Sequence, residues 1–200
     1  MLSFRKALAL CTAALTVTAA AVVSVPSSPV EAPVALAASV DYFLKIEGVD
    51  GESSDDRNKG SIEIQSWSWG ATNPGISMSG ASGGGGGGAG KVSIQDFHFK
   101  KSVDKSSPII MLMAATGEHI KKATLTVRKA GSKQNEFYKV TLEDVLISSY
   151  AANGDQGSVP MDSFSLNFAK ITVEYTPTKA DGSAGSPVKA GYDVKANKKI

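Results

Sequence analysis

The chain has 200 residues, of which 42% are hydrophobic and 20% charged, a balance typical of one soluble globular domain. Its 21 Lys and Arg residues oppose 19 Asp and Glu residues, so the formal net charge is only +2. The basic residues are also scattered, whereas a nucleic-acid surface needs clustered positive charge. The sequence therefore predicts no nucleic-acid partner.

The first residues have the pattern of a secretory signal peptide. Arg5 and Lys6 form a short positive segment, and an apolar run rich in Ala, Leu and Val follows over residues 7–25. An uncleaved membrane anchor is the alternative, because this run is just long enough to span a bilayer. Its many Ala, Thr and Ser residues insert weakly, which favours a cleaved signal.

The expected cleavage site follows a Pro/Ser segment. Ala35 and Ala37 give the small-x-small pattern that signal peptidase recognises, so we expect cleavage between Ala37 and Ala38. The only cysteine, Cys11, lies in the leader, so the mature chain can form neither disulfides nor thiolate metal sites. We expect the mature protein to be secreted or periplasmic, with no stable membrane insertion.

Most of the mature chain alternates apolar and polar residues with a period of two, which is typical of half-buried antiparallel strands. Four segments show this pattern: 41–47, 61–69, 92–99 and 123–128. In the last of them we expect an inward set and an outward set of side chains. The inward set is Ala123, Leu125 and Val127, and the outward set is Thr124, Thr126 and Arg128.

A short helix is predicted after Ser107, which can cap its first turn, with Pro108 at the first helical position. Residues 109–115 are almost wholly apolar, and Gly117 can end the helix in a left-handed conformation. Such a segment is expected to pack as a plug against the sheet and not to lie exposed.

Two longer β-rich runs follow, over residues 137–147 and 164–175. In the second run Phe164, Leu166 and Phe168 share one face, but the apolar positions change parity across Ala169–Lys170. One extra residue there predicts a β-bulge.

Three loops complete the chain. Residues 50–60 are polar and charged, and residues 73–90 include an unbroken run of glycine over 83–88. The last stretch, 177–200, is either a tail or an edge strand near Tyr192. Together these elements predict a single mainly β domain with one short helix, as a β-barrel or a two-sheet sandwich.

Candidate phosphate and calcium sites fail on their spacing. The glycine run ending in Lys91 imitates a phosphate-binding loop, but Val92 stands where that motif needs Ser or Thr, and a strand follows in place of a helix. The acidic residues of the 50–60 loop do not match an EF-hand and are followed at once by Arg57 and Lys59. A solvated charged loop is the favoured interpretation.

The histidines indicate no catalytic or metal site either. His98 and His119 lack metal spacing, and no Ser lies in a G-x-S-x-G turn. His98 should point away from Phe97 and Phe99, while His119 can favour the end of the helix. We therefore expect no enzyme activity, no cofactor and no metal.

Trp67 and Trp69 share one face of a predicted strand. Exposed, they could form a sugar-binding platform. Because large aromatic side chains are mostly buried, packing in the core or in a subunit contact is favoured.

Several stretches together carry a family resemblance. They are DYFLKIEG at 41–48, Trp67-Ser68-Trp69-Gly70, the segment from Phe97 through Lys101 and Asp104 to Pro108, and, most specifically, PMDSFSLNFAKI at 160–171 with Glu174-Tyr175 after it. In this order they resemble the Hcp (haemolysin-coregulated protein) family, the inner-tube proteins of type VI secretion systems. The motif residues expected in the core or a subunit contact are Trp67, Trp69, Phe97, Phe99, Met161, Phe164, Leu166, Phe168 and Tyr175.

The resemblance implies a two-sheet β-barrel over residues 38–176, flanked by one helix, with 177–200 as its tail or edge strand. It implies a homohexameric ring with a central pore, stacking into a tube, with spike and effector proteins as partners and a chaperone-like role. The loops 50–60 and 73–90 would reach neighbouring subunits or the next ring. The signal peptide departs from the family, whose members are otherwise cytoplasmic before secretion.

Two other functions remain open. An exported Hcp-like module could hold a peptide, a glycan or a small protein in its pore or on exposed aromatic side chains. An exported hydrolase that uses His98 or His119 is the remaining alternative.

Overall fold

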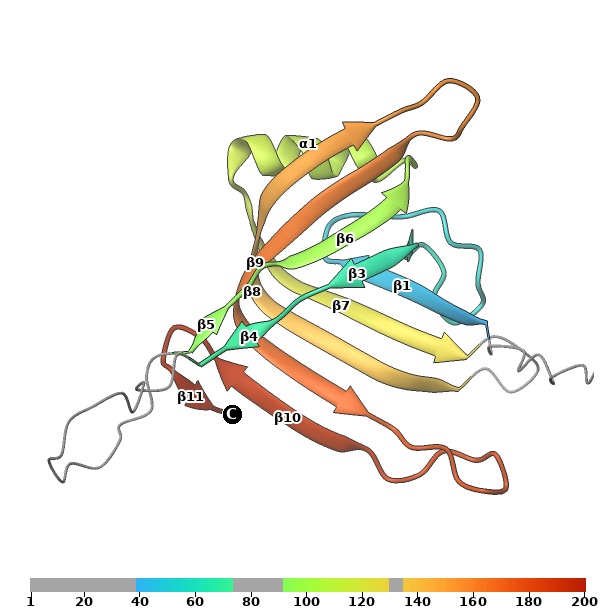
Figure 1. The fold of residues 1–200 in the computed structure, drawn as a ribbon, viewed down its shortest axis with the longest axis vertical. Coiled ribbons are helices and arrows are strands. Elements are labelled where there is room, and N and C mark those ends of the chain that lie inside the picture. The colour runs from blue at the N-terminus through green and yellow to red at the C-terminus, as the bar shows by residue number, and fades with distance from the viewer. Residues whose placement is uncertain (1–38, 74–91, 130–134) are drawn as a thin grey trace, which may run out of the picture. The chain divides into compact units, whose positions relative to one another are not determined.

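The computed structural model describes residues 39–73, 92–129 and 135–200 (Figure 1). Within these ranges antiparallel strands dominate, and the one helix is α1 (Ser107–Thr116), in agreement with the predicted mainly β class. None of the described helical residues forms a span long and apolar enough to cross a membrane. The strands are β1 (Val40–Ile46), β2 (Ile62–Ile64), β3 (Ser66–Ser68), β4 (Ala71–Thr72), β5 (Ser93–Ile94), β6 (Phe97–Ser102), β7 (His119–Lys129), β8 (Glu136–Asn153), β9 (Met161–Tyr175), β10 (Val188–Asp193) and β11 (Lys198–Lys199).

The strands form one large curved sheet and one small strand pair. The main hydrogen-bonded order is β11-β10-β9-β8-β7-β1-β2, with β6 also paired to β9 and β3 to β6, while β4 pairs only with β5. The chain from β2 to β3 changes partner within a few residues, because β2 pairs with β1 and β3 pairs with β6. The main order does not return to its starting strand, so the closed barrel predicted from the sequence is not confirmed.

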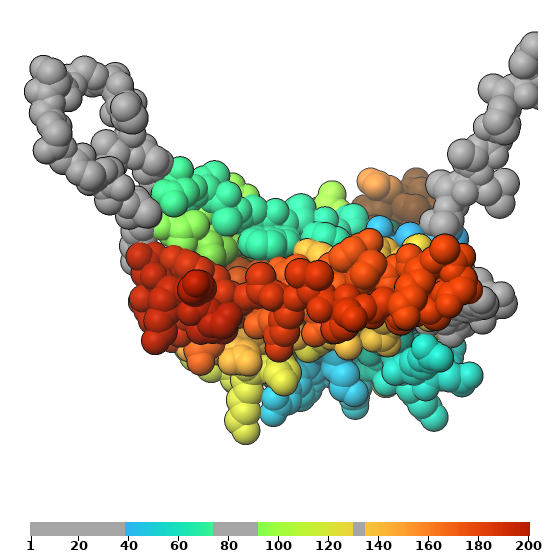
Figure 2. Space-filling model, turned by 90° about the horizontal axis from the view of Figure 1, so that it is seen from below, coloured from blue at the N-terminus to red at the C-terminus, as the bar shows by residue number. Residues whose placement is uncertain are grey.

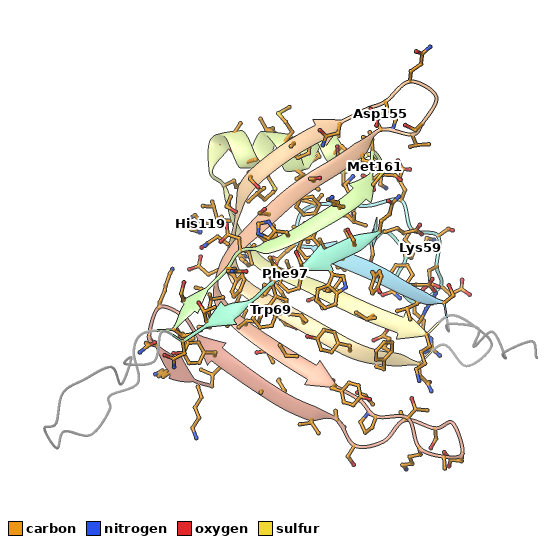
Figure 3. All side chains as sticks on the ribbon, in the orientation of Figure 1. Lys59, Trp69, Phe97, His119, Asp155 and Met161 are labelled. Carbon is orange, nitrogen blue, oxygen red and sulfur yellow. The ribbon has the colours of Figure 1, made fainter. Side chains whose placement is uncertain are left out.

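The core is built from the inward positions of the long strands. Leu44, Leu125, Val140 and Ile171 are examples, and each is almost fully buried. Figure 3 shows side chains gathered between the sheet strands, with Phe97 near the middle. Because every second residue of a strand points to the same face, the alternation in the sequence predicts this core directly.

The outward set predicted for residues 123–128 is partly wrong. Thr126 and Arg128 are buried, with 7% and 5% of their surface exposed. The guanidinium of Arg128 lies 4.9 Å from the ring centre of Phe43 on the neighbouring strand and is paired with Asp41 and with Asp55 of the 50–60 loop. The loop therefore covers the second face of the sheet here, which local alternation cannot reveal.

The 50–60 loop is not simply solvated, because its backbone folds back on itself. The Gly51 N–H donates to the Gly60 carbonyl at 2.8 Å, and the Ser53 N–H donates to the Ser61 carbonyl at 3.0 Å. A Cβ on Gly51 would lie 2.2 Å from the Ser61 oxygen, so only glycine fits this approach. Most of the 73–90 loop lies outside the described residues.

The predicted bulge at Ala169–Lys170 is misplaced. The register of β9 against β8 runs unchanged from Lys170 to Phe168, and the shift falls in β8 between Ile147 and Ser149. Opposite Ala169, β8 instead carries Asp144 in a left-handed conformation with φ of 53°. Aspartate tolerates this region better than most residues, so the neighbouring strand absorbs the irregularity.

The last residues form a strand at the sheet edge. β10 pairs with β9 along six residues, placing Tyr192 opposite Ile171, and β11 pairs with the end of β10 (Figure 1). Of the two alternatives for residues 177–200, the structure shows the edge strand.

Candidate functional site

The aromatic motif residues form a continuous stack inside the sheet. Phe99 contacts Phe97 with ring centres 4.8 Å apart and Phe164 with ring centres 5.3 Å apart. Trp67 lies 5.6 Å and Trp69 6.0 Å from the ring of Phe97. Both indoles are half-buried against the core, as expected for packed aromatics and not for a free platform.

The other motif residues divide between core and surface. Leu166 and Phe168 are buried in β9, while Met161 at its start is half-buried and lies near the Ser102 hydroxyl. Tyr175 at the end of β9 is 50% exposed, so it does not belong to the core.

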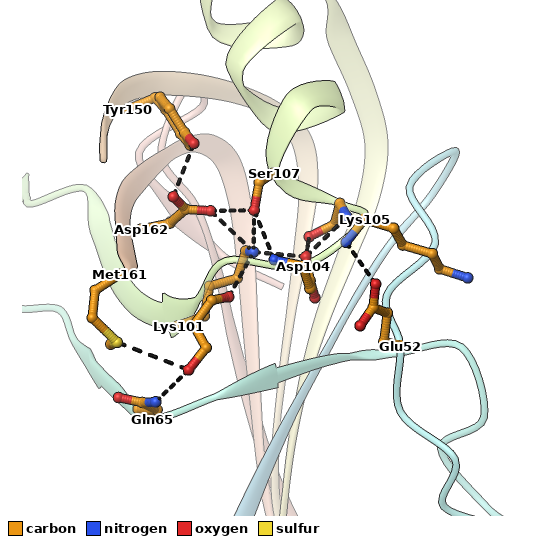
Figure 4. Close-up of polar contacts among 11 residues, drawn as sticks. Glu52, Gln65, Lys101, Asp104, Lys105, Ser107, Tyr150, Met161 and Asp162 are labelled. Atoms are coloured by element: carbon orange, nitrogen blue, oxygen red, sulfur yellow. Dashed lines mark hydrogen bonds and ion pairs between the residues drawn. The ribbon is translucent and has the colours of Figure 1, made fainter. Parts of the chain in front are cut away.

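A buried ion pair that the sequence reasoning missed joins β6, β9 and the start of α1 (Figure 4). The Lys101 Nζ lies 3.1 Å from Asp162 Oδ2, and neither side chain is exposed to solvent. Lys101 also donates to the Ser107 hydroxyl at 2.8 Å and to Asp104 Oδ1 at 2.7 Å. Such a pair needs these additional hydrogen bonds, because taking a charge out of water costs on the order of several kcal/mol for each ion.

Asp162 remains a carboxylate in this environment. Burial alone would raise the pKa of Asp162, but hydrogen bonds from Ser107, Tyr150 and Lys101 hold that pKa below its ordinary value. The contact with Asp162 also affects Tyr150. Burial, together with the hydrogen bond to Asp162 and its charge, raises the pKa of Tyr150 to about 12. Tyr150 donates its hydroxyl hydrogen to Asp162 Oδ1 at 2.9 Å.

The ion pair also fixes the start of α1. Ser107 donates to Asp162 and accepts from the Asp104 N–H at 3.0 Å, so the first turn is held against β9. The helix cap is Ser106, one residue earlier than predicted, and its side chain makes no capping hydrogen bond. Gly117 ends the helix in the left-handed conformation, as predicted.

The outer face of α1 is apolar and uncovered in the described chain. Ile109, Met111 and Leu112 are 41%, 47% and 55% exposed, and only Ile110 and Met113 among the large side chains are buried. The expectation of a plug against the sheet therefore holds only in part, because Ile110 and Met113 pack in the core but the sheet covers one side of the helix alone. Apolar patches of this kind mark contact surfaces.

A hollow of about 570 Å³ lies on the face of the sheet formed by β3, β6, β8 and β9. Five serine side chains line it, together with Trp67, His98 and Lys100. The lining thus combines small hydroxyl groups with the aromatic side chains of Trp67, Phe99, Tyr150 and Phe164, and Lys100 is its charged residue. The serines are Ser66, Ser68, Ser149, Ser163 and Ser165.

Neither histidine forms a catalytic arrangement. His98 points away from the core, and its Nδ1 lies 2.6 Å from the hydroxyl of Ser165, which is only 4% exposed. His119 pairs with Asp144, at 3.0 Å, and this partner differs from the predicted helix end. Among the described residues no group of acidic or histidine side chains could hold a metal ion.

Comparisons with known proteins decide the family. The family described as "Type VI secretion system effector, Hcp" matches residues 43–175. The chain belongs to the Hcp family. It is 44% identical over 162 residues to the protein hcp1 of Pseudomonas aeruginosa. The aligned region covers 80% of this chain and 98% of that relative.

Solved structures of Hcp proteins have the same fold. Hcp1 from Salmonella typhimurium is 32% identical, with a TM-score of 0.66 over 81% of this chain and 99% of its own. A structure described as a type six secretion system protein is 28% identical, with a TM-score of 0.76 over 81% of this chain and all of its own. The Hcp family is a family of structural secretion proteins and not of enzymes.

Proposed function

We propose that the mature chain is a structural subunit of a ring that stacks into the inner tube of a type VI secretion system. The observation that carries the proposal is the match to the P. aeruginosa hcp1 protein over 98% of that relative's length. The chain thus contains a counterpart for nearly every residue of an Hcp protein. By the resemblance, the ring is a homohexamer whose pore carries effectors, and a spike protein caps the tube.

Surface features support an assembling subunit. The exposed apolar face of α1 and the outer edge of the short strand β11 are both uncovered in the described single chain. Unpaired strand edges favour pairing with another chain, and ring closure removes them from solvent. We therefore include both the closed barrel and the hexameric ring in this proposal.

Light scattering and negative-stain electron microscopy of residues 38–200 test the ring. The expected result is a mass of six subunits and rings with an open pore. A mass of one subunit at high protein concentration contradicts the proposal. Leu112→Ser serves as the probe of the apolar helix face, with Val188→Ser, an exposed apolar residue of β10, as the control.

Export through a cleaved signal peptide is the second part of the proposal. It rests on the residue pattern from Arg5 to Ala37, and the product starts at Ala38. N-terminal sequencing of the protein recovered from outside the cytoplasm tests it. A recovered chain that still starts at Met1 contradicts cleavage.

The serine-lined hollow favours one alternative, an exported module that binds a peptide, a glycan or a small protein. Trp67 lines this hollow, so a ligand there should change tryptophan fluorescence. The alternative predicts such a change in a protein that stays monomeric, and a Trp67→Phe variant should lose it. A ring whose Trp fluorescence does not respond to candidate ligands favours the tube.

A further inference from the structure

A second hollow, of about 580 Å³, lies on the outer face of β1, β7 and β8 beside the 50–60 loop. Five basic residues line it against two acidic ones. In Figure 2 the blue, cyan and yellow atoms of β1, this loop and β7 lie together on the lower side of the molecule. The basic residues are Lys45, Arg57, Lys59, Lys122 and Lys139. We call this surface the basic hollow.

The floor of the basic hollow is built by strand register. Lys45 lies opposite Thr124, which lies opposite Thr141, and Phe43 lies opposite Thr126 in the next row. Both acids of the hollow already have a lysine nearby: Glu136 lies 3.3 Å from Lys139, and Glu47 lies 4.0 Å from Lys121. The hollow therefore keeps a positive excess.

Three lysines carry that excess. Among residues 39–73, 92–129 and 135–200, no carboxylate forms an ion pair with Lys45, Lys59 or Lys122, and all three are exposed. A surface that gathers uncompensated charge of one sign attracts a partner surface of the other sign.

The same face of the sheet carries a surface of the opposite sign. Glu63 lies opposite Phe43 in the register, and paired residues point to one face, so Glu63 stands next to the basic hollow. Glu63 is exposed and lines two adjoining hollows whose other carboxylates are Asp41, Glu52, Asp55 and Asp104. Arg128 is the only basic residue lining either of them. We call this the Glu63 surface.

We propose that the basic hollow binds the Glu63 surface of a second copy of this chain. The two surfaces lie side by side on one face and differ in sign. Two copies related by a half-turn therefore place each basic hollow against the other's Glu63 surface, and the contact is made twice. Lys45 of each copy faces Glu63 of the other. This contact joins the same face of two copies. The contacts that close a six-membered ring instead join two different surfaces of neighbouring subunits.

Light scattering of residues 38–200 at two salt concentrations tests the contact. Salt screens exposed charges, with a Debye length of about 10 Å at about 0.1 M and roughly 4 Å at about 0.5 M. A single chain should double its mass at low salt relative to high salt, and a ring, which carries this face on each subunit, should gain at least one further ring. A mass that does not change with salt overturns the proposal and leaves the ring proposal standing.

Charge reversal identifies the residues. Lys45→Glu and Glu63→Lys should each raise the dissociation constant of the pair by about tenfold, which is the scale of 1.4 kcal/mol. The combined Lys45→Glu/Glu63→Lys variant restores opposite charges and should recover most of the loss. Lys189→Glu, an exposed residue of β10, is the control with an equal charge change. Failure of the combined variant to recover, or an equal loss in the control, overturns the proposal.

Discussion

Two ion pairs of this Hcp protein differ mainly in their access to water. Lys101 and Asp162 are fully buried between β6, β9 and the start of α1, whereas Lys195 and Asp144 are 71% and 43% exposed. Both Asp162 and Asp144 have a pKa held below the ordinary value. For Asp144 the main causes of the lowered pKa are the hydrogen bonds from Lys195 and His119. For Asp162 burial is the largest influence and raises the pKa, and the hydrogen bonds to this carboxylate together outweigh it.

The comparison shows that burial, and not the distance between the charges, decides what a pair contributes. Breaking a buried pair leaves one charge without water or a partner, while breaking an exposed pair returns both groups to solvent. The Arg128 pairs with Asp41 and Asp55 lie between these limits, since Arg128 is 6% exposed and its partners are 37% and 15% exposed.

The largest expected effect is that of Asp162→Ala. This change removes the fully buried carboxylate partner of Lys101, leaves it only the partly exposed Asp104, and takes the acceptor from the Ser107 and Tyr150 hydroxyls. It should lower the free energy of unfolding by about 3–5 kcal/mol. Urea unfolding followed by circular dichroism measures it. A loss below about 1 kcal/mol would show that water reaches Lys101, in contradiction to its complete burial.

A double variant sharpens this result. Lys101→Met/Asp162→Leu removes both charges and keeps apolar volume, so it should be markedly more stable than Asp162→Ala. If the double variant is less stable than the single one, the lost contacts of Lys101 with Asp104 and Ser107 matter more than the loss of its Asp162 partner.

Arg128→Met should have the next largest effect. It removes the partner of Asp41 and Asp55 but keeps an apolar side chain over Phe43, so the expected loss is about 1–3 kcal/mol. Because the Arg128 hydrogen bond is the main cause that lowers the pKa of Asp55, this pKa should rise in the variant. NMR titration of the Asp55 carboxyl measures the shift, and an unchanged pKa would contradict the assigned contact.

Tyr150→Phe should cost less, about 1 kcal/mol at neutral pH, because one hydrogen bond to a charged group is lost. Its effect is sharper in alkali. The folded-state pKa of Tyr150 is about 12, above the ordinary 10, so its contribution is fully present below pH 10 and is lost as the pH rises from 10 to 12. Unfolding free energy measured between those pH values should fall less steeply in the variant. An identical slope in both proteins would show that groups other than Tyr150 cause the loss of stability in this pH range.

Lys195→Ala should have the smallest effect on the free energy of unfolding, because the pair with Asp144 is exposed and solvent screens it. The variant should also lessen the lowering of the Asp144 pKa, since the Lys195 hydrogen bond is its main cause. Thermal unfolding at low and high salt measures the stability. A loss as large as that of Arg128→Met would contradict the ranking by burial.

A careful reading of strand parity could have found the buried ion pair. Lys101 has the same parity as Phe97 and Phe99, and Asp162 has the same parity as Phe164 and Leu166. A lysine and an aspartate at core positions of two strands indicate a pair. Arg128 gave no such signal, because its face of β7 is covered by a loop distant in the sequence.

The sequence alone determined the mainly β class, the positions of most strands, the left-handed end of α1 and the Hcp family. These features follow from local periodicity, a local backbone preference and the order of motifs along the chain, so residues close together in the sequence are enough to predict each of them. It did not reveal the exposed outer face of α1, because only the neighbouring sheet decides which side of a helix is covered. Nor did it place the β-sheet irregularity at Asp144, because a neighbouring strand can absorb a change of parity. Tertiary structure decided these features, since each depends on contacts between segments that are far apart in the chain.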